Sequence, residues 1–228
     1  MGVKKIDMNI LRPFFLVLVL ALSACGKEEK PDLLATSNSP TPVLVFGDSL
    51  SAGYNIREGK EWPVLFEQKL KTLYWIRPDQ SVANYSKSGE TSSGGLRRFQ
   101  EALDETKPLV VILELGANDA LRRTSMTALR ANLTEMIVMC QKRNIEVVLV
   151  GVDLPARMFF VSTGSFIEIY QDLDKEKGVV FVDNLLKNVN NKSSLMQSDM
   201  LHPNEHGQLL MLENIWPGFE EAVREKSN

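Results

Sequence analysis

The sequence has few residues of the types that bind metals, form disulfides or contact nucleic acids. Its 228 residues include two Cys and two His, and the formal net charge at pH 7 is −3. Two Cys cannot form the disulfide framework of a small secreted domain, and the absence of a basic excess argues against a nucleic-acid partner. The sequence also has no GxGxxG or GxxxxGK[ST] motif for nucleotide phosphates and no HExxH motif for zinc. We therefore expect no cofactor and no metal.

Long hydrophobic runs are scarce as well. The apolar run at residues 14–22 is shorter than the about 20 apolar residues that a transmembrane helix needs. Basic residues precede this run and small residues follow it, which is typical of a signal peptide. Residues 22–26, LSACG, resemble a bacterial lipobox, in which the thiol of Cys25 is acylated and the chain is cut just before it. An ordinary secretory signal with an incidental Cys, or a membrane-spanning anchor, are the alternatives.

The lipobox resemblance implies a domain organisation and a location. Residues 1–24 would be a lipoprotein signal peptide, and the lipid on Cys25 would attach the chain to a membrane of the bacterial cell envelope. Gly26 in place of Asp implies the outer membrane or the periplasmic side rather than the inner membrane. Residues 25–42 are rich in charge, Ser and Pro, so we predict a flexible tether. Residues 43–228 would form the folded domain, in which Cys140 packs as a small hydrophobe.

From residue 43 onward, strand-like apolar runs alternate with amphipathic, helix-like stretches. Strands are predicted at 43–46, 81–85, 109–115, 147–152 and 179–182, and helices at 62–73, 96–103, 125–142, 166–175 and 206–224, with a break at Pro217 left open. Continuous apolar strands indicate burial on both faces, and hence a parallel sheet. We predict an α/β fold of three layers (αβα, flavodoxin-like) with a five-stranded parallel sheet and a site at the carboxyl ends of its strands.

Three candidate catalytic groups follow the first three predicted strands. Ser49 comes where a helix N-terminus could offer N–H groups to an oxyanion. Gly89 could bring its backbone N–H close to a substrate oxygen, and Asn118 could donate from its side-chain amide. Each also has a simpler interpretation, because Ser49 could only cap a helix and the other two could only form turns.

The fourth candidate element pairs Asp199 with His202. A carboxylate three residues before a His in a turn can accept the ring Nδ1–H, fix the tautomer and leave Nε2 as a base. A purely structural His is the alternative. His206 lies four residues later and raises the question of a shared metal site, but Pro203 indicates that a helix begins between the two His.

Four segments at these positions together resemble the SGNH, or GDSL, hydrolase family. Within the family the resemblance is strongest to the bacterial thioesterase, lysophospholipase and arylesterase subgroup, and it covers residues 43 to about 210. The segments are GDSLSAGY (47–54), NYSKSGETS (84–92), GANDALR (116–122) and DMLHPN (199–204). Two positions depart from the family pattern: Ala117, where Gly is more usual, and His206, where a small residue is often found.

The resemblance implies a role for each candidate. Ser49 would be the nucleophile, His202 the general base and then acid, and Asp199 the residue that orients it. The oxyanion hole would comprise the backbone N–H groups of Ser49 and Gly89 and the amide of Asn118. The implied activity is hydrolysis of acyl or lipid-type carboxylic esters through an acyl-enzyme, without a metal.

Two other functions remain open at this point. The same family includes carbohydrate O-deacetylases, and a lipid-anchored chain could be a non-catalytic surface module. Two features favour acyl or lipid esters: the match of SLSAGY (49–54) and NDALR (118–122) to the acyl-ester subgroup, and a membrane tether that would place the site near lipids. Residues 154–160 are also apolar enough to line an acyl pocket, although they could equally pack in the core under a loop. The expected partners are an ester or lipid substrate and a membrane, and no obligate protein partner is evident.

Overall fold

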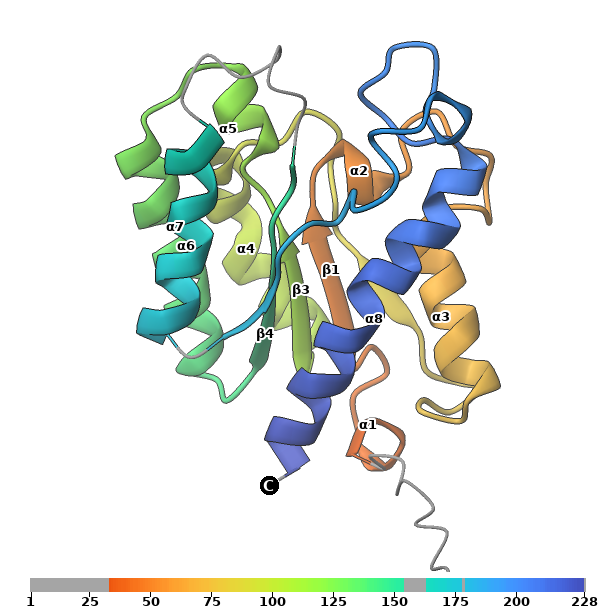
Figure 1. The fold of residues 1–228 in the computed structure, drawn as a ribbon. Helices are drawn as coiled ribbons and strands as arrows, with labels where there is room; N and C mark the ends of the chain where they lie inside the picture. Colours follow the sequence, from red (N-terminus) through yellow and green to blue (C-terminus); the bar gives the residue numbers. More distant parts are fainter. Residues whose placement is uncertain (1–32, 154–162, 178, 228) are drawn as a thin grey trace, which may run out of the picture.

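The protein is built on a parallel sheet of five strands (Figure 1). The computed structural model describes residues 33–153, 163–177 and 179–227. The strand order is β2-β1-β3-β4-β5, and every neighbouring pair is parallel. The strands are β1 (Val43–Gly47), β2 (Val82–Asn84), β3 (Val110–Glu114), β4 (Glu146–Val150) and β5 (Val180–Val182). This is the doubly wound order of flavodoxin-like domains, so the predicted fold class is confirmed.

Helices cover both faces of the sheet (Figure 1). One layer contains α3 (Trp62–Thr72) and α8 (Glu205–Ser227). The other layer contains α4 (Ser92–Thr106), α6 (Met126–Gln141) and α7 (Thr163–Lys177). The strands alternate between the two cores: in β1, Val43 and Val45 pack on one side, and Leu44 and Phe46 pack on the other. This explains why the central strands are continuous apolar runs.

Helix α8 continues through Pro217 without a break. A Pro inside a helix removes one backbone hydrogen bond and costs stability. The residues beside it offset that cost, because Trp216 and Phe219 are buried and their rings lie 5.8 and 4.8 Å from the ring of Phe66. Tertiary packing therefore overrides the local signal for a break.

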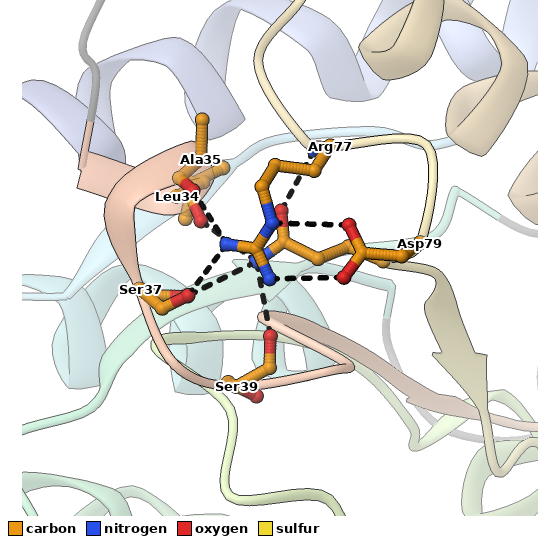
Figure 2. A network of polar contacts seen from close by, with 7 residues as sticks. Leu34, Ala35, Ser37, Ser39, Arg77 and Asp79 are labelled. Atoms are coloured by element: carbon orange, nitrogen blue, oxygen red, sulfur yellow. Dashed lines mark hydrogen bonds and ion pairs between the residues drawn. The ribbon is translucent and has the colours of Figure 1, made fainter.

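The folded domain begins about ten residues earlier than predicted. Residues 33–42 were expected to belong to the tether, but α1 (Leu33–Thr36) packs against the domain and Leu34 is fully buried in the core. Figure 2 shows Arg77 donating hydrogen bonds to the carbonyl oxygens of Ala35 and Ser37, while Asp79 holds its guanidinium. The polar composition of this segment gives no sign of packing. The segment is held mainly through its own backbone carbonyl oxygens, which every sequence has.

Several predicted features lie outside the described residues. These are the signal peptide at 1–24, the lipidation site Cys25, the first part of the predicted tether and the whole apolar stretch at 154–160. Within the part of the chain that is described, no helix is both long enough and apolar enough to cross a bilayer.

A substitution tests whether the segment before β1 is part of the fold. Leu34→Ala should lower the free energy of unfolding by about 2–5 kcal/mol, because it removes a fully buried side chain. Leu209→Ala, at a side chain that is 52% exposed on α8, should change it by less than about 0.5 kcal/mol. Urea unfolding measures both, and equal small effects would show that the segment is not packed.

Candidate active site

Ser49 lies in a tight turn at the carboxyl end of β1. It is the first residue of the short helix α2 (Ser49–Ala52), and Asp48, not Ser49, caps this helix by accepting a hydrogen bond from the Leu50 N–H at 3.0 Å. A Cβ at Gly47 would lie 2.8 Å from the backbone carbonyl oxygen of Glu114, so only Gly fits there. The capping role is thus filled by a neighbour, and the Ser49 hydroxyl is available for other contacts.

The hydroxyl of Ser49 lies within hydrogen-bond distance of His202. Ser49 Oγ and His202 Nε2 are 2.9 Å apart, and His202 Nδ1 is 2.7 Å from Asp199 Oδ2. The other carboxylate oxygen of Asp199 accepts hydrogen bonds from the backbone N–H groups of Leu201 and His202. Burial opposes ionisation of Asp199, but these hydrogen bonds outweigh it and lower the pKa of its carboxyl. The carboxylate is therefore ionised and fixed beside the imidazole.

Gly89 and Asn118 belong to the same cavity as the Ser49 hydroxyl. Together with Ser49 and His202 they line a cavity of about 160 Å³ at the carboxyl end of the sheet. Gly89 has φ of +75°, a left-handed conformation that favours Gly. One N–H of the Asn118 amide donates to Asp48 Oδ2 at 2.9 Å, which orients the amide and leaves its second N–H for another acceptor.

The two loops that carry Gly89 and Asn118 are tied together. Asn118 belongs to α5 (Ala117–Leu121), and its buried neighbour Asp119 accepts hydrogen bonds from the backbone N–H and the hydroxyl of Ser92, both at 2.7 Å. Just after α5, Arg122 donates to the carbonyl oxygen of Gly89 at 2.8 Å. These contacts hold the two candidate oxyanion donors in a fixed relation to each other.

The loop that carries His202 is tied to the loop that follows Ser49. The Gln197 amide donates to the carbonyl oxygens of Tyr54 and Pro203 and accepts a hydrogen bond from Asn55. The Tyr54 ring lies 4.5 Å from the His202 ring, measured between centroids. Gln197 thus joins the two sides of the site, and its role is not visible from the sequence.

Two buried carboxyl groups lie directly behind Ser49. Burial raises the pKa of Asp48 to about 6, although hydrogen bonds from Leu50 and Asn118 favour its ionised form. Burial and the nearby charge of Asp48 raise the pKa of Glu114 well above its usual value. Glu114 accepts a hydrogen bond from the Ser51 hydroxyl at 2.8 Å. The raised pKa favours the neutral form of Glu114 in the fold, which makes its burial tolerable.

Sequence reasoning missed Glu114. It lies in the apolar run LVVILEL at 109–115, a pattern that by itself predicts only a buried strand. A single acidic residue in such a run was the available signal, because a carboxyl group that is 0% exposed needs either a partner or a proton.

His206 and Cys140, the other two candidates for metal binding or catalysis, lie in places where they serve the fold. His206 lies in the first turn of α8, where its backbone N–H donates to Asn204. Cys140 is free and fully buried, as predicted, and burial raises the pKa of its thiol to about 12. In the ranges 33–153, 163–177 and 179–227, no group of three or more His, Cys, Asp or Glu side chains is arranged to hold a metal ion.

The fold and the Ser, His and Asp arrangement together define a hydrolase of the three-layer αβα class. The model of the GDSL-like lipase/acylhydrolase family matches residues 45–210, and the chain belongs to this family. It is an enzyme, an ester hydrolase, as its relatives are.

Two relatives and one solved structure illustrate the similarity. The chain is 33% identical to the esterase TesA of Pseudomonas aeruginosa over 185 residues, which cover 81% of this chain and 90% of that protein. It is 34% identical to thioesterase 1/protease 1/lysophospholipase L1 of Escherichia coli K12, covering 73% of this chain and 77% of the relative. A crystal structure of TesA matches with a TM-score of 0.74 and 32% identity, covering 79% of this chain and 98% of that one.

The raised pKa of Glu114 predicts how the free energy of unfolding depends on pH. In the unfolded chain a Glu loses its proton near pH 4.3, whereas in the folded chain burial and the charge of Asp48 raise the pKa of Glu114 well above its usual value. The folded form therefore binds more protons above that pH, and wild-type stability falls as pH rises. Glu114→Gln resembles the neutral acid and removes this loss, so its stability relative to wild type should increase as pH rises above about 4, by up to about 1.4 kcal/mol per pH unit, until the pH passes the folded-state pKa of Glu114.

Urea unfolding across this pH range measures the difference. Glu135→Gln, at an exposed side chain on α6, serves as the control and should show little pH dependence relative to wild type. If Glu114→Gln differed from wild type by the same amount at every pH, Glu114 would not be protonated in the folded protein.

Proposed function

We propose that the protein is a serine esterase that hydrolyses acyl esters through a Ser49–His202–Asp199 triad and an acyl-enzyme. Ser49 Oγ attacks the ester carbonyl while His202 Nε2 takes its proton, and Asp199 stabilises the imidazolium that forms. His202 then gives the proton to the departing alcohol oxygen. A water molecule then attacks the acyl-enzyme while His202 Nε2 takes its proton. His202 returns this proton to Ser49 Oγ as the carboxylic acid leaves.

The observation that carries this proposal is the continuous hydrogen-bond chain from Asp199 through His202 to Ser49, with distances of 2.7 and 2.9 Å. The charge that develops on the carbonyl oxygen also has donors nearby. The backbone N–H groups of Ser49 and Gly89 and the Asn118 amide belong to residues that line one cavity. Fixed donors of this kind contribute about 3 kcal/mol each to transition-state stabilisation.

The cavity suggests which acyl groups fit. Its lining includes the apolar side chains of Leu50, Ala117, Leu121 and Leu201, which suit a hydrocarbon chain better than a sugar. Its volume of about 160 Å³ lies below the roughly 300 Å³ at the lower end of small-molecule sites. Short acyl chains are therefore the favoured substrates, and the relatives named as esterases and lysophospholipase support an acyl ester over other classes.

A carbohydrate O-deacetylase is the second candidate, and the same small cavity is the observation in its favour. An acetyl group needs less space than any longer acyl chain and would leave the sugar at the cavity mouth. Tyr54, which is 48% exposed and lines the cavity, could stack against a sugar ring there. The apolar lining is what makes this the less favoured of the two.

For its location, we propose that the enzyme is a lipoprotein of the bacterial cell envelope, anchored by acylation of Cys25. The support is the sequence LSACG at 22–26, which follows a basic and then an apolar segment. Mass spectrometry of the membrane-extracted protein should show a diacylglyceryl-type modification on an N-terminal Cys25, and Cys25→Ser should abolish it.

Replacement of the nucleophile gives the most direct kinetic test of the triad. Ser49→Ala should lower kcat for p-nitrophenyl esters by several orders of magnitude, because triad members act as a unit. Ser93→Ala, in an exposed part of α4, is the matched control and should retain full activity. Retention of more than a few per cent of kcat by a folded Ser49→Ala protein would refute the assignment.

The volume of the cavity predicts which acyl-chain lengths the enzyme prefers. Across p-nitrophenyl acetate, butyrate, hexanoate, octanoate and laurate, kcat/KM should be highest for butyrate or hexanoate and should fall for longer chains. The reason is that chains beyond the volume of the cavity must leave it. A maximum at acetate, with little activity on butyrate, would favour the deacetylase, and a maximum at laurate would contradict the use of this cavity.

A further inference from the structure

The chain enters the domain at the end of the sheet opposite to the candidate active site. The segment before β1 lies against the amino ends of the strands, where the carbonyl oxygens of Pro40 and Pro42 accept hydrogen bonds from Ser81 and Leu109. β1 then crosses the sheet, and Ser49 follows it at the carboxyl end. Figure 1 shows α1 at the foot of the domain and α2 at the top.

This entry point is fixed by buried and hydrogen-bonded contacts. The Gln80 amide is almost fully buried and donates to the carbonyl oxygens of Leu34 and Ser39, both at 3.0 Å. Arg77 donates to the carbonyl oxygens of Ala35 and Ser37 at 2.7 and 2.9 Å (Figure 2). The described part of the domain therefore begins at Leu33, at the foot, rather than at β1.

The length of chain between this point and Cys25 is short. Seven residues, 26–32, separate Cys25 from Leu33. Whatever their conformation, the eight Cα–Cα steps span at most about 28 Å. A domain of about 200 residues has a radius of gyration of about 16 Å, which corresponds to about 40 Å from foot to top. To turn its top toward the membrane, the domain would have to place its foot farther from Cys25 than the chain can reach.

We propose that the active site cannot be turned onto the bilayer that holds Cys25, and that its substrate is an ester delivered from the aqueous phase rather than a lipid of that bilayer. This inference rests on the proposed lipidation and esterase activity. It reverses the expectation that a membrane tether brings the site close to lipids. The hydrogen bonds from Arg77 and Gln80 cause this restriction, because they hold the segment before β1 on the domain. If the chain were free from Cys25 to Val43, it would be long enough for the active site to reach the membrane surface.

The test uses the full lipidated chain reconstituted in phosphatidylethanolamine/phosphatidylglycerol vesicles. One fluorogenic butyrate ester is presented in two ways: dissolved, or linked through a short spacer to the headgroup of a phospholipid in the same vesicles. We expect rapid hydrolysis of the dissolved ester and slow hydrolysis of the membrane-linked ester, because a linker that cannot span two sites gives an effective concentration near zero. Vesicles are kept dilute so that encounters between them are rare.

A longer tether provides the decisive comparison. Insertion of about 20 Gly and Ser residues after Glu29 adds about 65 Å of reach. Hydrolysis of the membrane-linked ester should then increase by at least about tenfold, while hydrolysis of the dissolved ester stays unchanged. The same insertion in a Cys25→Ser protein is the control and should change neither rate. Equal hydrolysis of the membrane-linked ester by the original and the extended lipidated chains would overturn the proposal.

The readouts separate this failure from failure of the underlying proposals. An inactive lipidated protein is recognised by its lack of activity on the dissolved ester, and it refutes the esterase assignment. A protein without acyl groups is recognised by its mass and by its failure to float with vesicles, and it refutes the anchor. Either result also overturns the orientation, whereas fast hydrolysis of both esters by the original lipidated chain overturns the orientation alone.

Discussion

The hydrogen bond between Ser49 and His202 joins two loops that are 153 residues apart in the sequence. Its formation requires the whole sheet, because β1 presents Ser49 at the carboxyl end and the turn before α8 presents His202 at the same end. Gln197 connects the two loops directly, and Asp199 holds the imidazole from the other side. The site is thus a property of the closed domain, and loosening of either loop would separate the two groups before the fold itself is lost.

The polar groups behind the site lower the stability of the fold. Asp48 and Glu114 are both buried, and burial disfavours the charged form of each. Asp48 nevertheless orients the Asn118 amide, and Glu114 accepts hydrogen bonds from the Ser51 hydroxyl and the Asp48 N–H. A pair of apolar side chains would pack here at lower cost, but it could not hold the amide beside Ser49. Such local destabilisation at a functional site is common in enzymes.

Much of the fold could be predicted because the central strands β1, β3 and β4 are buried on both faces, so their apolar runs are long and clear. The candidate site residues were also predictable, since each follows a strand or lies in a short polar motif. Other features depend on contacts that sequence patterns do not reveal. The segment at residues 33–42 is polar in composition and held through its carbonyl groups, Glu114 is hidden in an apolar run, and α8 passes Pro217 because flanking aromatic residues are buried.

Covalent labelling tests the pairing of Ser49 with His202 most directly. The protein would be treated with a fluorophosphonate and digested, and the modified peptide would be identified by mass spectrometry. We predict a single adduct on Ser49, formed quickly in the wild-type protein and at least about 100-fold more slowly in a folded His202→Ala variant, because the base no longer removes the hydroxyl proton. An adduct on another residue, or equal labelling of Ser49 without His202, would contradict the account.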